Sequence, residues 1–275
     1  MDDHLDQWEL YLKALYAKTT RIAYLYDVKR FQMFVGKSLL EVTPHDIQRF
    51  VTQEGQRLAA STVCRLVSAL RAFYAWCIQG ELLEESPVNA IKTPRGGKRL
   101  PRVLRRDEIE ALLRHRGSRR ERAVLLLMLD AGLRLVEVSR LLRTDINLQD
   151  RKVLVQGKGD KQRMVPLSKR LHDALADWLY HKQGSPHDPL FPGYKGEALK
   201  PRAIGYIVSR IGQGVHLERN LSPHLLRHTF ATRLLRQGVN LRVIQQLLGH
   251  ANISTTQIYT EVVSADLVQA IGQLK

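Results

Sequence analysis

The stretch 222–230, SPHLLRHTF, could hold an anion at the start of a helix. Ser222 offers a hydroxyl that can cap a helix, and Pro223 suits the first helical turn. His224 and Arg227 are three residues apart, so they share one face of that helix. The face continues into apolar residues that should meet the core, where an unpaired cation is costly. We therefore expect an anion here, because the backbone N–H groups of a helix start also favour negative charge.

Four further residues have side chains that could act on the same anion. Arg134 carries a permanent charge on a planar guanidinium group, which suits phosphate oxygens in a two-pronged fashion. Lys158 is expected at the tip of a hairpin between two glycines, a position that gives its amine reach. His250 follows a glycine that should end a helix, and Tyr259 is expected one turn into a short helix. Together these residue types can stabilise charge on a phosphate, transfer a proton and supply a nucleophilic oxygen.

Each of these residues also has an ordinary structural explanation when it is taken alone. A tyrosine in a helix usually packs, and a lysine at a hairpin tip usually lies in solvent. Arg134 could pair with Glu137 three residues on, and His250 could cap a helix. The segment GKGDK lacks the spacing of a phosphate-binding P-loop, so nucleotide binding is not expected. The combination of residues, rather than any one of them, favours phosphate chemistry.

The charge of the chain is concentrated in its second part. The 275 residues include 43 Lys and Arg against 27 Asp and Glu, a net charge of +16. Residues 1–91 have a net charge of −1, whereas residues 92–275 have a net charge of +17. Such a field favours a polyanionic partner, and double-stranded DNA fits both the charge and the phosphate chemistry. A basic surface that serves only solubility is the alternative.

Residues 1–91 are expected to form a small domain of four helices. Apolar residues recur at helical spacing over 5–15 and 22–34, Thr43 and Pro44 start a third helix, and Ser61 starts a fourth. The following segment 92–102, KTPRGGKRLPR, has two prolines, two glycines and five basic residues. We expect a basic linker that could follow a phosphate backbone, although a plain tether has the same composition.

Residues 103–275 are expected to form a mixed α+β domain, so the whole fold is predicted to be mainly α with a small β-sheet. RDEIEALL indicates a capped helix, and ERAVLLLMLDAG a buried helix that ends at Gly132. KVLVQGKGDKQRMVPL alternates apolar residues around Gly157, Gly159 and Asp160, which predicts a β-hairpin. Further helices are expected in RLVEVSRLL, LHDALADWL, AIGYIVSRIG and NLRVIQQLLG.

Cysteine use and hydropathy favour a protein of the cytoplasm. Cys64 and Cys77 have neither metal-ligand nor redox spacing, so buried free thiols are expected. No apolar run approaches the roughly 20 residues that span a bilayer, so no membrane insertion is expected. The first residues, MDDHLDQWEL, are acidic and lack a signal-peptide pattern.

Four segments resemble, in order, the signature boxes of the tyrosine recombinase (phage integrase) family: AGLRLVEVSRLL, GKGDKQRMVPL, LSPHLLRHTFATRLL and LLGHANISTTQIY. The resemblance is strong over about residues 100–263. Residues 1–91 resemble the helical, SAM-like core-binding domain of the family, with a weaker local signal. The run LGHANISTTQIYT is closest to the Xer-type branch, which resolves chromosome or plasmid dimers and so serves chromosome partition.

The resemblance implies a site-specific DNA recombinase and identifies its site residues one by one. The positions that match the catalytic residues of the family are Arg134, Lys158, His224, Arg227, His250 and the nucleophile Tyr259, with Glu137 in support. In that family Tyr259 would form a covalent 3′-phosphotyrosyl bond to DNA. No cofactor and no metal are expected, because cationic side chains do what Mg²⁺ does in other phosphoryl-transfer enzymes.

The resemblance also implies an assembly on DNA. A tetramer on two recombination sites is expected, either of identical chains or with a second recombinase, and the need for an activating partner protein stays open. The tail at about 264–274 is expected to form a helix with Leu267, Ile271 and Leu274 on one apolar stripe. Exchange of this helix with a neighbouring protomer is implied by the resemblance, and docking on its own domain is the alternative.

Three rival functions stay open at this point. An integrase of a mobile element shares the same residues, and a type IB topoisomerase-like DNA-relaxing enzyme uses similar chemistry without strand exchange. The third is a DNA-binding regulator with a dead site, but the complete set of catalytic residue types speaks against it.

Overall fold

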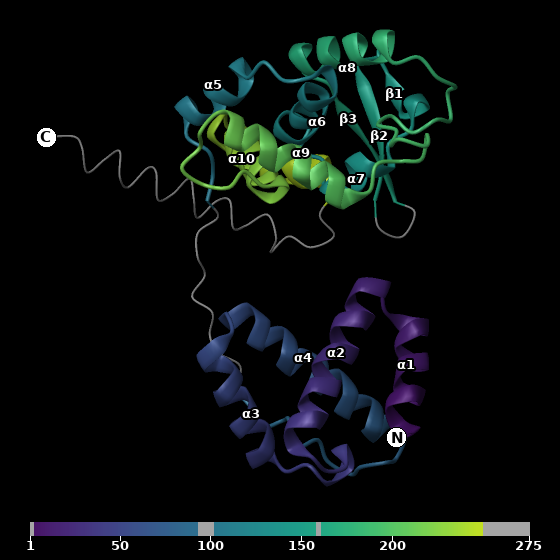
Figure 1. Cartoon of the computed structure of the whole chain (residues 1–275), viewed down its shortest axis with the longest axis vertical. Helices are drawn as coiled ribbons and strands as arrows, with labels where there is room; N and C mark the ends of the chain where they lie inside the picture. The colour runs from purple at the N-terminus through teal and green to yellow at the C-terminus, as the bar shows by residue number, and fades with distance from the viewer. Residues whose placement is uncertain (1–2, 93–101, 158–160, 250–275) are drawn as a thin grey trace, which may run out of the picture. The chain divides into compact units, whose positions relative to one another are not determined.

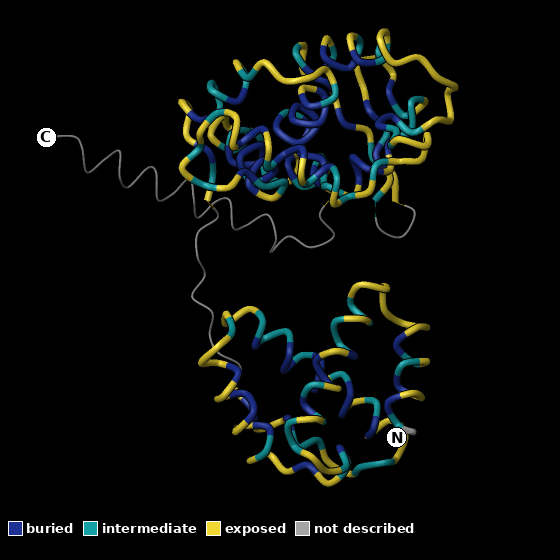
Figure 2. The backbone as a smooth tube through the Cα atoms, in the orientation of Figure 1, coloured by how far each residue is buried: buried dark blue, intermediate teal, exposed yellow. Residues whose placement is uncertain are grey.

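The computed structural model of the chain describes residues 3–92, 102–157 and 161–249. Over these residues the fold is mainly α-helical with one three-stranded sheet, which confirms the predicted fold class. The chain divides into an N-terminal unit, Met1–Lys98, and a C-terminal unit, Arg99–Lys275. Each unit has a hydrophobic core of its own (Figure 2).

The described part of the N-terminal unit contains the four predicted helices (Figure 1). They are α1 (Asp3–Leu15), α2 (Lys18–Val35), α3 (Pro44–Arg57) and α4 (Ala60–Gln79), with a short 3-10 turn at Leu39–Glu41. Their apolar faces meet around large aromatic side chains that are almost fully buried, among them Trp8, Phe31, Phe50 and Phe73. The rings of Trp8 and Phe73 meet edge to face with their centroids 5.2 Å apart. This aromatic core explains why short helices, which would be only marginally stable in isolation, are stable when packed together.

The starts of α3 and α4 show two ways of beginning a helix. At α3, the Thr43 hydroxyl accepts a hydrogen bond from the Asp46 N–H, and the Asp46 carboxylate accepts one from the Thr43 N–H. This reciprocal pair is the cap that the sequence predicted. The fourth helix was expected to start at Ser61, but α4 begins at Ala60, and Ala59 at its cap position makes no side-chain bond. Packing of the apolar face of α4, rather than a cap, sets where that helix begins.

The C-terminal unit combines helices with the small sheet (Figure 1). Its elements, in chain order, are α5 (Arg106–Arg114), α6 (Arg119–Leu129), α7 (Leu135–Arg140), a 3-10 turn at Arg143–Asp145, β1 (Ile146–Asn147), β2 (Lys152–Gln156), β3 (Gln162–Pro166), α8 (Lys169–His181), α9 (Pro201–Gly214), α10 (Pro223–Arg236) and α11 (Leu241–Leu248). The helices predicted between residues 103 and 249 are present, and the predicted hairpin is β2–β3.

Helix α6 is the centre of the C-terminal core. Its residues from Ala123 to Leu129 are all buried, and α8, α9 and α10 pack against it. The helix ends at Leu129, three residues before the predicted Gly132, and Asp130 is its C-cap residue. Gly132 has a φ of +63°, and a Cβ there would meet the Phe230 ring at 2.4 Å. Only glycine allows this turn to lie so close to α10, and the turn leads directly into α7.

The sheet is antiparallel in the order β1-β2-β3. Val153 pairs with Val165, and Gln156 pairs with Gln162 at the end next to residues 158–160. Buried valines at 153, 155 and 165 attach the sheet to the core. Strand β1 was not predicted, because two residues are too few to show an alternating pattern.

The cysteines agree in part with the expectation of buried thiols. Both are thiols that form no disulfide; Cys77 is buried, but Cys64 is only partly buried. Among the described residues, no helix is both long and apolar enough to cross a membrane.

Candidate active site

The site begins at α7, where Glu137 binds the residue that precedes the helix. The Arg134 backbone N–H donates to one carboxylate oxygen of Glu137 at 2.7 Å, and Arg134 Nη1 donates to the other at 2.8 Å. Glu137 is buried, whereas the Arg134 side chain is 39% exposed. The pairing of Arg134 with Glu137 that the sequence allowed is therefore present. It orients the guanidinium group of Arg134 and leaves that group partly exposed to solvent.

Helix α10 supplies Arg227. Its start is as predicted, since Ser222 Oγ accepts a hydrogen bond from the Leu225 N–H and Pro223 occupies the first turn. The Arg227 side chain is 6% exposed, and its two terminal nitrogens donate to the carbonyl oxygens of Gly132 and Leu248. Nη1 also lies 3.9 Å from Glu137 Oε2. The buried cation is thus balanced by one carboxylate and two main-chain dipoles.

A third arginine, Arg163 on β3, belongs to this cluster and was not among the predicted site residues. Its two terminal nitrogens donate to the two oxygens of Glu137 at 2.9 and 2.8 Å, and its Nε donates to the Leu247 carbonyl at 2.7 Å. The sequence contained a signal for it. Arg163 lies two residues before the buried Val165, so the strand pattern places it on the inward face, where a charge requires a partner.

The three arginines meet at the end of α11. Arg163 binds the Leu247 carbonyl, Arg227 and Arg134 both bind the Leu248 carbonyl, and Arg134 also binds the Gly249 carbonyl at 3.2 Å. The carbonyls at the end of a helix lack helical partners and carry partial negative charge, so cations are favourable there. Gly249 has a φ of +63° and ends the helix, as predicted.

The neighbouring arginines keep the Glu137 carboxylate ionised. Burial alone would raise the pKa of the carboxyl, but hydrogen bonds and charge from Arg163, together with those from Arg134, outweigh burial and hold the pKa below its usual value. Glu137 is therefore ionised at neutral pH, and its four hydrogen bonds from Arg134 and Arg163 are charge-assisted.

His224 differs from the expectation that it lies on an apolar face. The residue is exposed, one turn before the buried Arg227, because the first turn of α10 is at the surface of the unit. His228 is half-buried, and burial lowers the pKa of its imidazole, with further lowering from the nearby His224 and Arg227. An unprotonated His228 adds no charge beside the arginines at neutral pH.

Three predicted site residues, Lys158, His250 and Tyr259, lie outside the described residues, as does the predicted helix at 264–274. Their flanking residues are described. Gly157 N–H donates to the Lys161 carbonyl at 2.7 Å beside residues 158–160, and Gly249 immediately precedes His250.

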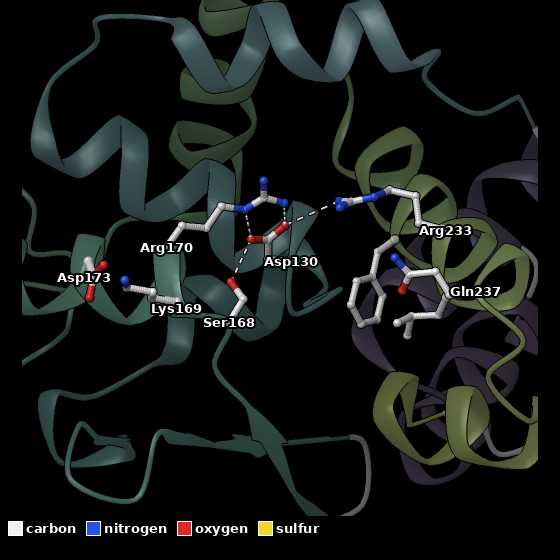
Figure 3. Close-up of a pocket in the computed structure, with 9 residues that line it drawn as sticks. Asp130, Ser168, Lys169, Arg170, Asp173, Arg233 and Gln237 are labelled. Atoms are coloured by element: carbon white, nitrogen blue, oxygen red, sulfur yellow. Dashed lines mark hydrogen bonds and ion pairs between the residues drawn. The ribbon is translucent and has the colours of Figure 1, made fainter.

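A second cluster of arginines around a carboxylate lies at a pocket of about 520 Å³ (Figure 3). Arg170 and Arg233 point at Asp130 from two sides, and Ser168 Oγ donates to it at 2.8 Å. None of the predicted site residues that the structure describes, Arg134, Glu137, His224 and Arg227, lines this pocket. Among the described residues, no group of three or more His, Cys, Asp or Glu side chains could hold a metal ion.

Comparison with known families agrees with this architecture. Residues 102–265 match the model described as "Phage integrase family", and residues 5–81 match "Phage integrase, N-terminal SAM-like domain". Because these matches cover most of the chain, the protein belongs to the phage integrase family, the family of tyrosine recombinases.

Within that family the chain is of the Xer type. It is 34% identical over 270 residues to tyrosine recombinase XerC of Bacillus subtilis (strain 168), covering 92% of this chain and 89% of the relative. It is 35% identical over 269 residues to tyrosine recombinase XerD of Lacticaseibacillus casei, covering 92% and 90%. The structure of XerH site-specific recombinase bound to a palindromic difH substrate, a post-cleavage complex, aligns with a TM-score of 0.76 and 25% identity over 92% of this chain and 79% of that one. Site-specific DNA recombination is therefore the function that is supported, and the Xer type is favoured over a mobile-element integrase or a topoisomerase-like enzyme.

Proposed function

We propose that this protein resolves chromosome or plasmid dimers by cutting and rejoining DNA through a 3′-phosphotyrosyl bond to Tyr259. One observation carries the proposal: the guanidinium groups of Arg134 and Arg227, from two distant segments, converge on the Leu248 carbonyl, two residues before His250. Two convergent guanidinium groups match the non-bridging oxygens of a phosphodiester. Arg134 is partly exposed, so a phosphate can approach it from solvent.

The reaction assigns one role to each residue. The Tyr259 oxygen attacks the scissile phosphorus, the bond from phosphorus to the 5′ oxygen breaks, and a 3′-phosphotyrosyl bond forms. Arg134, Arg227 and His250 stabilise the negative charge that develops on the non-bridging oxygens. Lys158 donates a proton to the departing 5′ oxygen, which is otherwise a poor leaving group. His224, exposed at the start of α10, either assists Tyr259 or binds a phosphate oxygen.

The proposed chemistry uses no nucleotide and no metal ion. The energy of the phosphodiester is kept in the phosphotyrosyl bond, so rejoining by a 5′-hydroxyl requires no ATP. The positive charge that a metal would supply comes from arginine, lysine and histidine side chains.

The proposed substrate is held by both parts of the chain. Residues 1–91 and 103–275 would contact opposite faces of the duplex, joined by the basic segment 92–102, and four protomers would bring two sites together. Relatives named XerC and XerD match at 34% and 35% identity, so tetramers of one chain and of two different recombinases are both forms of this proposal.

Covalent trapping on DNA tests the central step. The purified full-length protein is incubated with fragments of genomic DNA, covalent adducts are isolated under denaturing conditions, and the trapped segment is sequenced. A nicked duplex of that segment, from which the cleaved end diffuses away, is then offered to wild type and to Tyr259→Phe. We expect a shifted protein–DNA band with wild type and none with Tyr259→Phe, at equal DNA affinity. An adduct formed by Tyr259→Phe would contradict the assignment.

Truncation tests the assembly separately from the chemistry. Deletion from Ser264 onward should leave binding of one site nearly intact and abolish both the complex of two sites and strand exchange. If the truncated protein still recombines two sites at the wild-type rate, the tail does not join protomers.

A further inference from the structure

We propose that Arg163 is a positioning residue for DNA cleavage: from β3 it fixes both Glu137 and the end of α11 that leads to His250 and Tyr259. This inference rests on the proposed function, because the step it supports is formation of the phosphotyrosyl bond. Arg163 is outside the set of residues assigned to the phosphate, and its own contacts explain why.

All the nitrogens of Arg163 are engaged inside the protein. Nη1 and Nη2 bind the two oxygens of Glu137, Nε binds the Leu247 carbonyl, and the side chain is only 12% exposed. All three nitrogens of Arg163 bind Glu137 or the Leu247 carbonyl, so the contacts of this side chain are made within the protein. Its effect on the reaction must therefore pass through the groups that it holds.

The first of these groups is Glu137, which in turn orients Arg134. Glu137 Oε1 accepts from both Arg163 Nη1 and Arg134 Nη1, at 2.9 and 2.8 Å. Because Arg163 binds both oxygens in a fork, it fixes the plane of the carboxylate, and that plane sets the direction in which Arg134 is held. Without Arg163 the carboxylate would keep its contacts to α7 but lose the fixed orientation.

The second group is the turn that follows α11. A Cβ at Gly249 would lie 3.0 Å from Arg163 Nη1 and 3.2 Å from its Cδ, so the turn packs directly on this side chain. The Nε bond to Leu247 ties the last turn of α11 to the same side chain. Arg163 therefore holds the main chain at the point from which it continues to His250 and Tyr259.

Arg163 also connects these groups to the sheet. It pairs with Val155 in the β2–β3 ladder, whose two strands flank residues 158–160. One side chain thus joins three segments that carry predicted site residues: the start of α7, the hairpin, and the end of α11.

Substitution of Arg163 separates a positioning role from a purely structural one. We expect Arg163→Met to cleave the nicked duplex about 100-fold more slowly at saturating DNA, the loss typical of a displacement of about 1 Å in a site. The Kd for DNA should stay within about twofold, because Arg163 is not on the binding surface. Arg170→Met is the matched control, since Arg170 also binds a buried carboxylate, Asp130, away from the cluster. At temperatures below its unfolding midpoint, Arg170→Met should cleave at the wild-type rate.

The pH profile is a readout that loss of stability alone would not change. Among the described residues, the charged groups that face Glu137 are Arg134 at the cap of α7, Arg163 on β3 and Arg227 on α10. Removing Arg163 lets burial raise the pKa of Glu137, so on acidification the cleavage rate of Arg163→Met should fall at a pH where wild type still cleaves at its full rate. Wild type and Arg170→Met should lack this acid limb. Arg163→Lys should lack it too, yet stay about tenfold slow, because one ammonium group cannot bind Glu137 and Leu247 together.

A pair of glycine substitutions tests the turn without touching Arg163. Gly249 and Gly238 both have positive φ, at +63° and +78°, but nothing lies within 4 Å of a Cβ at Gly238. Gly249→Ala should slow cleavage about tenfold, because its methyl group displaces the Arg163 guanidinium. Gly238→Ala carries the same backbone strain and should not slow cleavage.

Failure of the positioning role of Arg163 and failure of the proposed function give different experimental results. If wild type forms no adduct, the proposed function fails. If wild type forms the adduct but Arg163→Met cleaves as fast as Arg170→Met and shows no acid limb, the positioning role of Arg163 is wrong.

Discussion

Asp130 and Glu137 lie on either side of the turn between α6 and α7, and each is a buried carboxylate bound by arginines. The arginines at Asp130, Arg170 and Arg233, are about one-third exposed at the edge of a pocket. At Glu137, Arg163 and Arg227 are 12% and 6% exposed, and their remaining nitrogens bind main-chain carbonyls of α11 and the turn.

The two clusters differ in what their charges hold in place, and this difference bears on the proposed role of the Glu137 cluster in DNA cleavage. The charges at Asp130 tie α8 and α10 to the end of α6. The arginines at Glu137 also bind main-chain carbonyls at the end of α11, so they hold both the carboxylate and that helix end in place. The next experiments test whether the two clusters, which differ in their contacts, also differ in their effects on DNA cleavage and stability.

The largest expected effect is on cleavage by Arg227→Lys. A lysine keeps the charge but loses the fork, and removal of one donor that stabilises transition-state charge costs about 2.7–4 kcal/mol, roughly 10²–10³ in rate. Arg233→Lys, on the same helix but facing Asp130, is the control and should change the rate by no more than about fivefold. Single-turnover cleavage of the nicked duplex measures both. If Arg227→Lys and Arg233→Lys lose cleavage rate equally, the Glu137 and Asp130 clusters do not differ in function.

The second effect is on stability. Glu137→Gln leaves two nearly buried arginines without their counter-charge, and removing one partner of a buried ion pair costs about 3–5 kcal/mol. Asp130→Asn should cost about 1–2 kcal/mol, because its arginines are partly hydrated. The shift of the urea unfolding midpoint measures each cost. A larger shift for Asp130→Asn would show that exposure of the arginines does not decide the cost.

The smallest effect is the pH dependence of the contribution that Glu137 makes to the free energy of unfolding. The folded state holds the pKa of Glu137 below the usual value of 4.5, so the stabilisation is complete at higher pH and is lost as the pH falls through the folded-state pKa. The difference in unfolding free energy between wild type and Glu137→Gln should therefore start to shrink below about pH 4.5. Urea titrations at several pH values measure this difference. Growth of the difference on acidification would mean that the pKa is raised.

Much of the architecture follows from the sequence, and the exceptions have physical causes. The cap at Thr43, the start of α10 at Ser222 and the stop at Gly249 are local signals, and the structure contains each of them. Strand β1 and the start of α4 depend on packing between segments, so no local signal marks them.

The site shows the same division between local and long-range information. Residue types and order within the family boxes predict Arg134 and Arg227 as site residues. Their meeting at Leu248 does not follow from the sequence, because those contacts span 114 and 21 residues. Arg163 could have been found from the strand pattern, but its binding to Glu137 and Leu247 required the tertiary structure.

The most direct test of the account is whether the Glu137 cluster faces the charge of the reacting phosphate. A nicked duplex with a neutral methylphosphonate at the scissile position removes that charge while leaving the Tyr259 reaction intact. If Arg134 stabilises the charge, the defect of Arg134→Ala should shrink from roughly 100-fold on phosphate to less than about tenfold on methylphosphonate. Arg233→Ala, in the Asp130 cluster, should show the same ratio between the two substrates as wild type. An Arg134→Ala defect of equal size on both substrates would contradict the account.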